Sequence, residues 1–351
     1  MSFPKLLILI GLVLFGTIGI AAVFKKKKNL VPSSSLVLET ALIEVDLDPE
    51  VKPLRREEAR QKEEPREAKK TKEVIVETAP SKEKELRGFV AKSDSADLPE
   101  TDRIAELFNK QGEKLPIVET ITYKSRVAWQ KGRPAWLSDY ASHFATSRHF
   151  IARSLNGKPD YFKQEIGEGD QFNVLRPDIN LNFYLLIDIS RSKLWFYALD
   201  IDKNERILLK TYKVGLGRPA PEKASGLLTP VGKYSLGNKI AIYKPKTMGF
   251  HNGQQIEMVS VFGSRWIPFE KEVAGCSSPA KGFGIHGVPW NLEKKGEPLE
   301  DLSSLGQYES DGCIRLATAD IEELFAIIIT KPTIVELVKD FYDAKLPGIE
   351  K

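Results

Sequence analysis

Cysteine and histidine are scarce in this sequence. Its 351 residues include two cysteines, Cys276 and Cys313, and four histidines. Two cysteines cannot build a disulfide framework, and sequence alone leaves open whether they form a single bridge. The chain has no CxxC motif and its histidines follow no ligand spacing, so we expect no metal site. A net charge of only +4 predicts no nucleic-acid surface.

A long hydrophobic run lies near the N-terminus. The residues from Leu6 to Phe24 carry no charge and are numerous enough to cross a bilayer core. Because the run exceeds the apolar part of a typical signal peptide, an uncleaved membrane anchor over residues 1–28 is favoured over a cleaved peptide. The lysines at 25–28 would hold the body of the protein in the cytoplasm by the positive-inside rule.

Residues 29–97 have the composition of a linker. The stretch PLRREEARQKEEPREAKKTKEV is dense in both charges and poor in large apolar side chains, so it cannot bury a core. Beyond it, LPETDRIAELFNK predicts a short helix, closed near Gly112, within a connector over residues 98–124. At the other end of the chain, residues 339–351 are predicted to be a C-terminal tail.

A small α/β unit is predicted over residues 125–175. SRVAWQKG is predicted to be its first strand and IGEGDQFNVL its second. Between them, PAWLSDYASHFA and SRHFIARSLNG have the apolar spacing of two helices, and Trp136 belongs to the apolar face of the first. His143 and His149 are six residues apart and do not share a helix face. We expect both of them on the surface.

This β-α-α-β unit resembles a LysM domain, with KG at the first turn and YASHFATS between the helices. The resemblance implies binding of glycans that contain N-acetylglucosamine. The sequence departs from the family at Arg133 and Pro134, where an aspartate and a threonine are usual. This departure would weaken or abolish binding.

From Asn182 to Val338 the pattern becomes that of strands. NFYLLIDISRSKLWFYAL predicts a hairpin that turns at SRSK. Further strands are predicted in ILLKTYKVGLG, LLTPVGKYSLGNKIAIY, MVSVFGS, GFGIHGV and PTIVELV. TADIEELFAIIIT is the one clear helix, with acidic residues near its start. The fold class expected here is a mainly β domain.

Cys313 is the candidate nucleophile of this β domain. A catalytic cysteine needs thiolate character and a base, which is usually a histidine. His286 is a polar residue within the apolar run GFGIHGVPW, whereas His251 has the sequence context of a loop tip. Gly312 would allow the backbone to approach a substrate, and adjacent N–H groups would form an oxyanion hole. Spacing alone leaves open that Cys313 is simply a buried apolar residue.

The ordered motifs TPVGKYSL, IHG, SDGCIRL and PTIVEL resemble the L,D-transpeptidase catalytic domain of the YkuD family, over residues 182–338. The resemblance implies a β-sandwich-like fold. It also implies a cysteine that attacks the carbonyl of the third residue of a peptidoglycan tetrapeptide stem and expels the terminal D-alanine. By motif, Cys313 would be the nucleophile and His286 its general base, with Gly287 orienting the imidazole.

The residues around Cys313 match the motif at most positions. Ser310, Gly312 and Arg315 stand at the flanking positions, but Asp311 replaces the usual histidine. An aspartate beside the thiol would raise the pKa of the thiol unless Arg315 offsets it. Arg315 has two open roles, a substrate contact or a structural pair with Asp311 or a carbonyl.

Two further features remain open. The segment between His286 and Ser310 is longer than usual for the family and is either a loop that selects substrate or a surface insertion. Cys276 is either a packing residue or a disulfide partner.

Together these features predict a peptidoglycan L,D-transpeptidase without a cofactor, whose partners are peptidoglycan and the membrane. One alternative is an L,D-carboxypeptidase, which passes the thioester to water. Another is a non-catalytic wall-binding protein that retains the fold, an alternative favoured by Asp311. Because peptidoglycan lies outside the cytoplasmic membrane, we expect a single-pass protein with its catalytic domain on the periplasmic or extracytoplasmic side. This placement conflicts with the cytoplasmic location that the lysines at 25–28 predict by the positive-inside rule.

Overall fold

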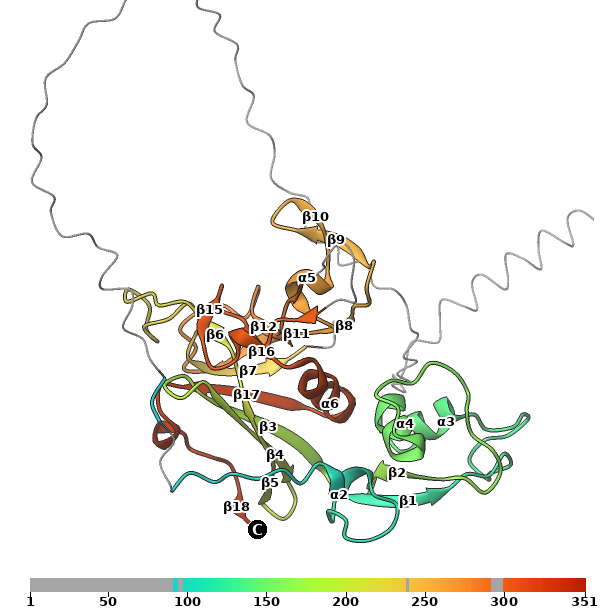
Figure 1. Cartoon of the computed structure of the whole chain (residues 1–351). Coiled ribbons are helices and arrows are strands. Elements are labelled where there is room, and N and C mark those ends of the chain that lie inside the picture. Colours follow the sequence, from blue (N-terminus) through green and yellow to red (C-terminus); the bar gives the residue numbers. More distant parts are fainter. Residues whose placement is uncertain (1–90, 94–96, 238–239, 292–298) are drawn as a thin grey trace, which may run out of the picture. The chain divides into compact units, whose positions relative to one another are not determined.

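The computed structural model describes residues 91–93, 97–237, 240–291 and 299–351 (Figure 1). Within these ranges, no helix is both long and apolar enough to cross a membrane. The anchor expected from Leu6 to Phe24 and nearly all of the expected linker lie outside them. Both therefore stay predictions. All the described residues belong to one unit, Ile43–Lys351.

The small unit has the element order β1, α3, α4, β2 (Figure 1). Its elements span Val118–Thr122, Leu137–His143, Arg148–Asn156 and Gln171–Leu175. β1 and β2 pair antiparallel. The β-α-α-β order agrees with the sequence prediction, but the first strand lies upstream of the predicted one. SRVAWQKG forms turns instead, and only an isolated bridge joins Val127 to Gln130.

The apolar face of α3 forms much of the core of the small unit. Leu137, Tyr140 and Ala141 are buried, as their helical spacing predicts. The prediction is wrong for Trp136, whose side chain is 56% exposed. Trp136 is the N-cap and has an extended backbone, so its side chain does not follow the helical face. The guanidinium of Arg133 lies 5.1 Å from the centroid of this indole ring.

Ten strands among the described residues form one sheet in the order β16-β12-β11-β7-β17-β3-β4-β5-β18, with β8 beside β11. In chain order they are β3 Leu181–Asp188, β4 Lys193–Asp200, β5 Glu205–Lys213, β7 Gly232–Leu236, β8 Ala241–Ile242, β11 Arg265–Ala274, β12 Gly284–Gly287, β16 Ile314–Leu316, β17 Thr333–Val338 and β18 Ile349–Glu350. The hairpin predicted to turn at SRSK is confirmed as β3 and β4.

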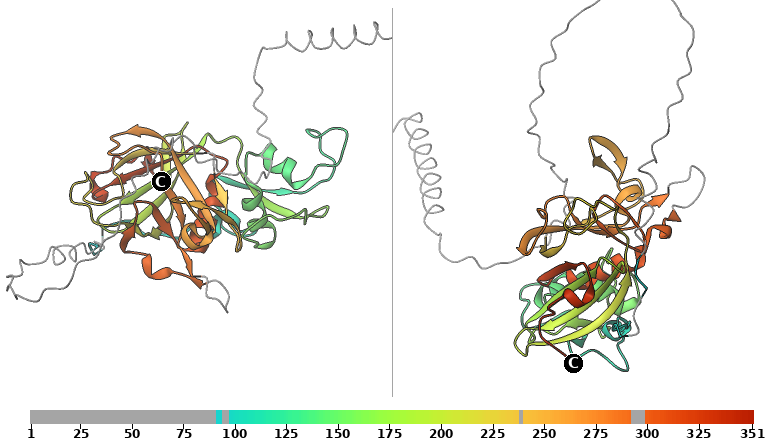
Figure 2. Two further views of the ribbon diagram at one scale, coloured as in Figure 1. Left: turned by 90° about the horizontal axis from the view of Figure 1, so that it is seen from above. Right: turned by 90° about the vertical axis from the view of Figure 1, so that its left-hand side faces the viewer.

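The sheet bends along β11. The first half of this strand pairs with β12, and the second half pairs with β7 across two register shifts. Such bulges bend a strand, and in Figure 2 the orange strands around β11 and β12 form a layer apart from the green strands β3–β5. The helix α6, Thr318–Ile328, buries Ile321 and Leu324 in the core cluster shared with Leu185 and Ile285. The expected mainly β domain is confirmed.

The remaining elements are short. They are α2 Ala105–Phe108, β6 Leu216–Gly217, β9 Met248–His251, β10 Gln254–Glu257, α5 Val259–Phe262, β13 Trp290–Asn291, β14 Leu299–Glu300, η2 Leu302–Ser304, β15 Tyr308–Ser310 and η3 Phe341–Asp343. The short helix expected before Gly112 is confirmed as α2. The strand expected in MVSVFGS is wrong, because Gly263 at φ +59° closes a single helical turn, α5, there.

The small unit packs directly on the sheet domain. Arg265 of β11 is 1% exposed and forms an ion pair with Asp160, which follows α4. The ring of Phe325 on α6 lies 5.0 Å from the Arg265 guanidinium and 5.2 Å from the ring of His149. His149 also contacts Asp160, so its expected surface position is wrong, whereas His143 is exposed. This buried ion pair fixes the small unit against β11, the strand that pairs with β12.

Candidate active site

The two candidate catalytic residues lie on neighbouring strands. β12 and β16 run parallel, with His286 opposite Arg315. Cys313 immediately precedes β16 and lies two residues from Arg315, so their side chains share one face of the sheet. That face also carries His286. From ordinary strand spacings, the Cα atoms of His286 and Cys313 lie diagonally at roughly 8 Å.

His286 is held in a defined tautomer. Its Nδ1 lies 2.7 Å from the carbonyl oxygen of Gly287. A carbonyl only accepts, so Nδ1 carries the proton and the neutral ring presents Nε2 as its free acceptor. The side chain is 3% exposed, and this burial lowers the pKa of His286 to about 4, with a smaller contribution from the charge of Arg315.

The thiol of Cys313 lies against the start of β12. Its Sγ is 3.6 Å from the carbonyl oxygen of Gly282, and the backbone N–H of Gly284 also hydrogen-bonds to it. Burial raises the pKa of Cys313 to about 11. The charge of Arg315 and the Gly284 N–H oppose this rise, whereas Asp311 adds to it, as predicted for an aspartate beside the thiol.

These shifts make the resting pair neutral. Between a pKa of about 4 for His286 and about 11 for Cys313, the imidazole is unprotonated and the thiol keeps its proton. The arrangement therefore suits general-base catalysis, in which the proton leaves the sulfur as the sulfur attacks. It does not suit a preformed thiolate–imidazolium pair.

The turn before β16 is fixed by its own residues. The hydroxyl of Ser310 donates to the carbonyl of Cys313 at 2.7 Å and accepts from the N–H of Gly312 at 3.1 Å. Gly312 has φ +115°, a conformation that favours glycine. A Cβ there would also lie 2.9 Å from the carbonyl oxygen of Leu228. Ser310 and Gly312 thus set the position of the cysteine.

Asp311 and Arg315 do not form the ion pair that the sequence left open. Asp311 pairs instead with Arg218, and both of these side chains are exposed. The Nε atom of Arg315 is buried and has no hydrogen-bond partner within the described ranges. Burial lowers the pKa of its guanidinium. A cationic group with an unused donor therefore lies beside the candidate pair.

Two aromatic residues at the site were not predicted. Trp266 pairs across the sheet with His286, and their ring centroids are 5.8 Å apart. Phe262 of α5 packs edge-on against the same imidazole at 5.4 Å. Trp266 belongs to β11, which has no regular apolar alternation, and MVSVFGS has the composition of a strand. No signal in the sequence places either ring beside His286.

The other candidates lie apart from the pair. Both cysteines are free, and the Sγ of Cys276 donates to the carbonyl of Lys233 at 2.9 Å. The ring of His251 packs against Phe262 at 5.2 Å, and its charge makes the smallest of the named contributions to the pKa of His286. In the described part of the chain, no three His, Cys, Asp or Glu side chains gather as metal ligands.

Comparison with known families finds that residues 182–337 match the model of YkuD, the L,D-transpeptidase catalytic domain. One similar solved structure is the helical cell shape determining protein Pgp2 from Campylobacter jejuni, with 21% identity over 49% of this chain and 51% of that chain and a TM-score of 0.31. Another is Bd1075 of Bdellovibrio bacteriovorus, with 16% identity, coverages of 45% and 48%, and a TM-score of 0.29. The chain spans about half the length of these two structures. No curated protein gives a significant match.

Proposed function

Because residues 182–337 form a YkuD L,D-transpeptidase catalytic domain, we propose that this chain is a peptidoglycan L,D-transpeptidase that acts through a thioester on Cys313. One observation supports the proposal most strongly. Cys313 and His286 share a sheet face on paired strands, and the hydrogen bond from Nδ1 to Gly287 leaves Nε2 of His286 free as a base.

The reaction proceeds in two proton-balanced halves. In the first, Nε2 of His286 takes the thiol proton as Sγ of Cys313 bonds to the carbonyl carbon of the third stem residue. The bond to the terminal D-alanine breaks, and its departing amine takes that proton. In the second, an amine of a neighbouring stem attacks the thioester, gives its proton to His286, and Sγ recovers it. One amide bond replaces another, and no cofactor is consumed.

Arg315 contacts the stem in this proposal. Arg315 lies opposite His286 in the strand register, and its buried Nε is unpartnered among the described residues. A buried donor without a partner is unfavourable, so an acceptor from the substrate would stabilise it. The stem that loses D-alanine ends in a carboxylate, which matches the charge and geometry of a guanidinium.

The rest of the chain brings this domain to its substrate. The small unit from β1 to β2 is proposed to bind glycan strands as a LysM-like module. Its exposed Trp136 supports this role, because sugar rings pack on aromatic faces. The run Leu6–Phe24 anchors the chain in the cytoplasmic membrane, with the catalytic domain on the extracytoplasmic side. A protease site inserted after Lys28 should be cleaved in intact spheroplasts, and full protection would contradict this placement.

Intact-mass spectrometry tests the reaction. The full chain in mild detergent is incubated with a tetrapeptide-stem muropeptide or a carbapenem, beside Cys313→Ala and His286→Ala. We expect an adduct that Cys313→Ala abolishes and that His286→Ala slows by about 10²- to 10⁴-fold.

The muropeptide products separate the alternatives. A cross-linked dimer supports the transpeptidase, whereas only a tripeptide stem identifies a carboxypeptidase. No adduct with either reagent, from a protein that binds glycan, identifies a non-catalytic binder.

A further inference from the structure

The strand that leads to Cys313 has little support of its own. β15 is three residues long and, among the described residues, pairs only with the two-residue β6. At the ends of this short pairing, the N–H of Leu216 donates to the carbonyl of Gln307 and the N–H of Arg218 donates to the carbonyl of Ser310, each at 2.9 Å. Ser310 is also the residue whose hydroxyl pins the Cys313 turn. A displacement of β15 would therefore move Cys313 with it.

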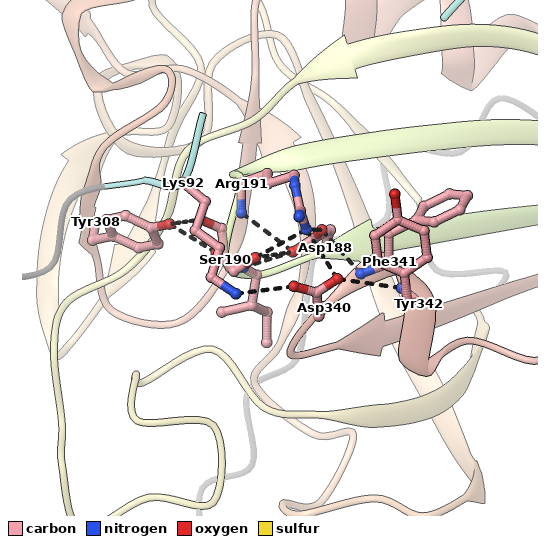
Figure 3. A network of polar contacts seen from close by, with 9 residues as sticks. Lys92, Asp188, Ser190, Arg191, Tyr308, Asp340, Phe341 and Tyr342 are labelled. Carbon is pink, nitrogen blue, oxygen red and sulfur yellow. Dashed lines mark hydrogen bonds and ion pairs between the residues drawn. The ribbon is translucent and has the colours of Figure 1, made fainter. Parts of the chain in front are cut away.

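Tyr308 ties β15 to a distant turn. Its side chain is 8% exposed, and its hydroxyl donates to the carbonyl of Ile189 at 2.8 Å, with the carbonyl of Ser190 at 3.1 Å (Figure 3). Both carbonyls belong to the turn between β3 and β4. The hydroxyl thus joins the strand before the cysteine to the central hairpin of the large sheet.

That turn is held by one buried carboxylate. Asp188 is fully buried and accepts from the N–H and the hydroxyl of Ser190, each at 2.8 Å, and from the N–H of Phe341 at 3.0 Å. It also accepts from the guanidinium of Arg191, which reaches on to Asp340 at 3.0 Å (Figure 3). A carboxylate with this many donors fixes the turn, so Tyr308 bonds to a rigid partner.

We propose that Tyr308 is a positioning residue for Cys313, acting through β15 from the Asp188 turn. This inference rests on the proposed function for its kinetic consequence, but not for its geometric one. A catalytic group displaced by about 1 Å loses rate on the order of 10²-fold. Loss of the Tyr308 hydroxyl would loosen one attachment of β15 without touching the substrate or the chemistry.

The test is Tyr308→Phe in the full chain, measured at a temperature where it is folded. We expect kcat for stem acylation to fall at least about tenfold while KM stays within about twofold, because the binding surface is intact. Alkylation of Cys313 by iodoacetamide should instead become at least about threefold faster, because a loosened turn exposes the thiol. Cys276 reports general loosening in the same molecule, and its alkylation should not change.

Tyr123→Phe is the matched control. Tyr123 is also buried and donates to a main-chain carbonyl, that of Ala135 at 2.6 Å, but it belongs to the core of the small unit. It should leave both the kcat and the Cys313 alkylation rate unchanged. Incorporation of p-aminophenylalanine at position 308 restores an N–H donor and should recover kcat.

Three results would overturn the inference: an unchanged kcat and alkylation rate in Tyr308→Phe, a parallel rise in alkylation of Cys276 and Cys313, or equal effects of the two tyrosine variants. If the wild-type chain is never acylated, the proposed function fails. The alkylation comparison then decides the positioning role alone.

Discussion

The turns that carry the two cysteines share a local pattern but differ in their surroundings. Each cysteine follows a glycine of positive φ, +62° at Gly275 and +115° at Gly312. A Cβ on Gly275 would meet nothing within 4 Å. A Cβ on Gly312 would lie 2.6 Å from Cε1 of Phe283 and 2.9 Å from the carbonyl oxygen of Leu228. There is therefore space for a side chain at position 275 but not at position 312.

The thiols differ in the side chains beside them, not in their main-chain contacts. Cys276 donates to the carbonyl of Lys233 at 2.9 Å, and Cys313 donates to that of Gly282 at 3.6 Å. Cys313 shares a sheet face with His286 and Arg315, which offer a base and a positive charge. A Gly-Cys dipeptide therefore does not identify a nucleophile. Pairing of its strand with the strand that carries the base does.

Substitution of each cysteine by serine is the most direct way to break this comparison. We expect Cys313→Ser to lower the rate of stem acylation by at least about 10⁴-fold, because it removes the nucleophile. Cys276→Ser should stay within about twofold of the wild-type rate. Acylation rates from intact mass measure both, and comparable losses in the two variants would show that the thiols act together.

Substitution of Gly275 and Gly312 by alanine compares the two turns by their effect on the stability of the fold. Gly275→Ala should destabilise the fold by about 1–2 kcal/mol, the usual strain of a left-handed residue with a Cβ. Gly312→Ala adds a steric conflict with Phe283 and Leu228, so we expect a loss of about 3 kcal/mol or more and a displaced Cys313. Denaturant unfolding measures the difference. Equal losses of unfolding free energy in the two variants would mean that the Phe283 ring and the Leu228 carbonyl can move aside at little cost.

Sequence patterns predicted the parts of the fold whose signal is local. The β-branched and aromatic runs on both sides of SRSK gave β3 and β4, and the periodicity of TADIEELFAIIIT gave α6. β11 escaped prediction because RWIPFEKEVA mixes a buried first half with an exposed second half and contains Pro268. Its apolar alternation therefore breaks where the strand passes from one layer to the other.

The site divides in the same manner. Scarcity of cysteine and histidine, with the family resemblance, was enough to nominate Cys313 and His286. Several of the side chains around the site come from tertiary pairing. Trp266 meets His286 only because β11 pairs with β12, and Arg218 reaches Asp311 only through the parallel pairing of β6 with β15. The pairing of distant strands cannot be read from a single sequence.

Alkylation and stem acylation of Cys313 should depend on pH differently, because the first follows the ionisation of Cys313 and the second that of His286. Because burial raises the pKa of the thiol to about 11, the thiolate fraction rises about tenfold per pH unit from pH 7 to about pH 11. Alkylation by iodoacetamide in a Cys276→Ser background should follow this rise. Stem acylation uses the neutral imidazole instead, so it should stay level above pH 5 and fall as His286 gains a proton near pH 4. An alkylation plateau below pH 8 would reveal a thiolate at rest and contradict the neutral pair.

The smallest expected effect concerns the residue that departs from the family pattern. The carboxylate of Asp311 raises the pKa of Cys313 and the guanidinium of Arg315 lowers it, each less than burial raises it. Asp311→Asn should therefore speed alkylation at pH 8 by about twofold, and Arg315→Gln should slow it by a similar factor. The Asp311 side chain is exposed and paired with Arg218, so solvent screens most of its charge from the thiol. If Asp311→Asn changes the alkylation rate tenfold or more, the carboxylate acts strongly on the pKa of the thiol. The replacement of the usual histidine by Asp311 would then have a functional effect.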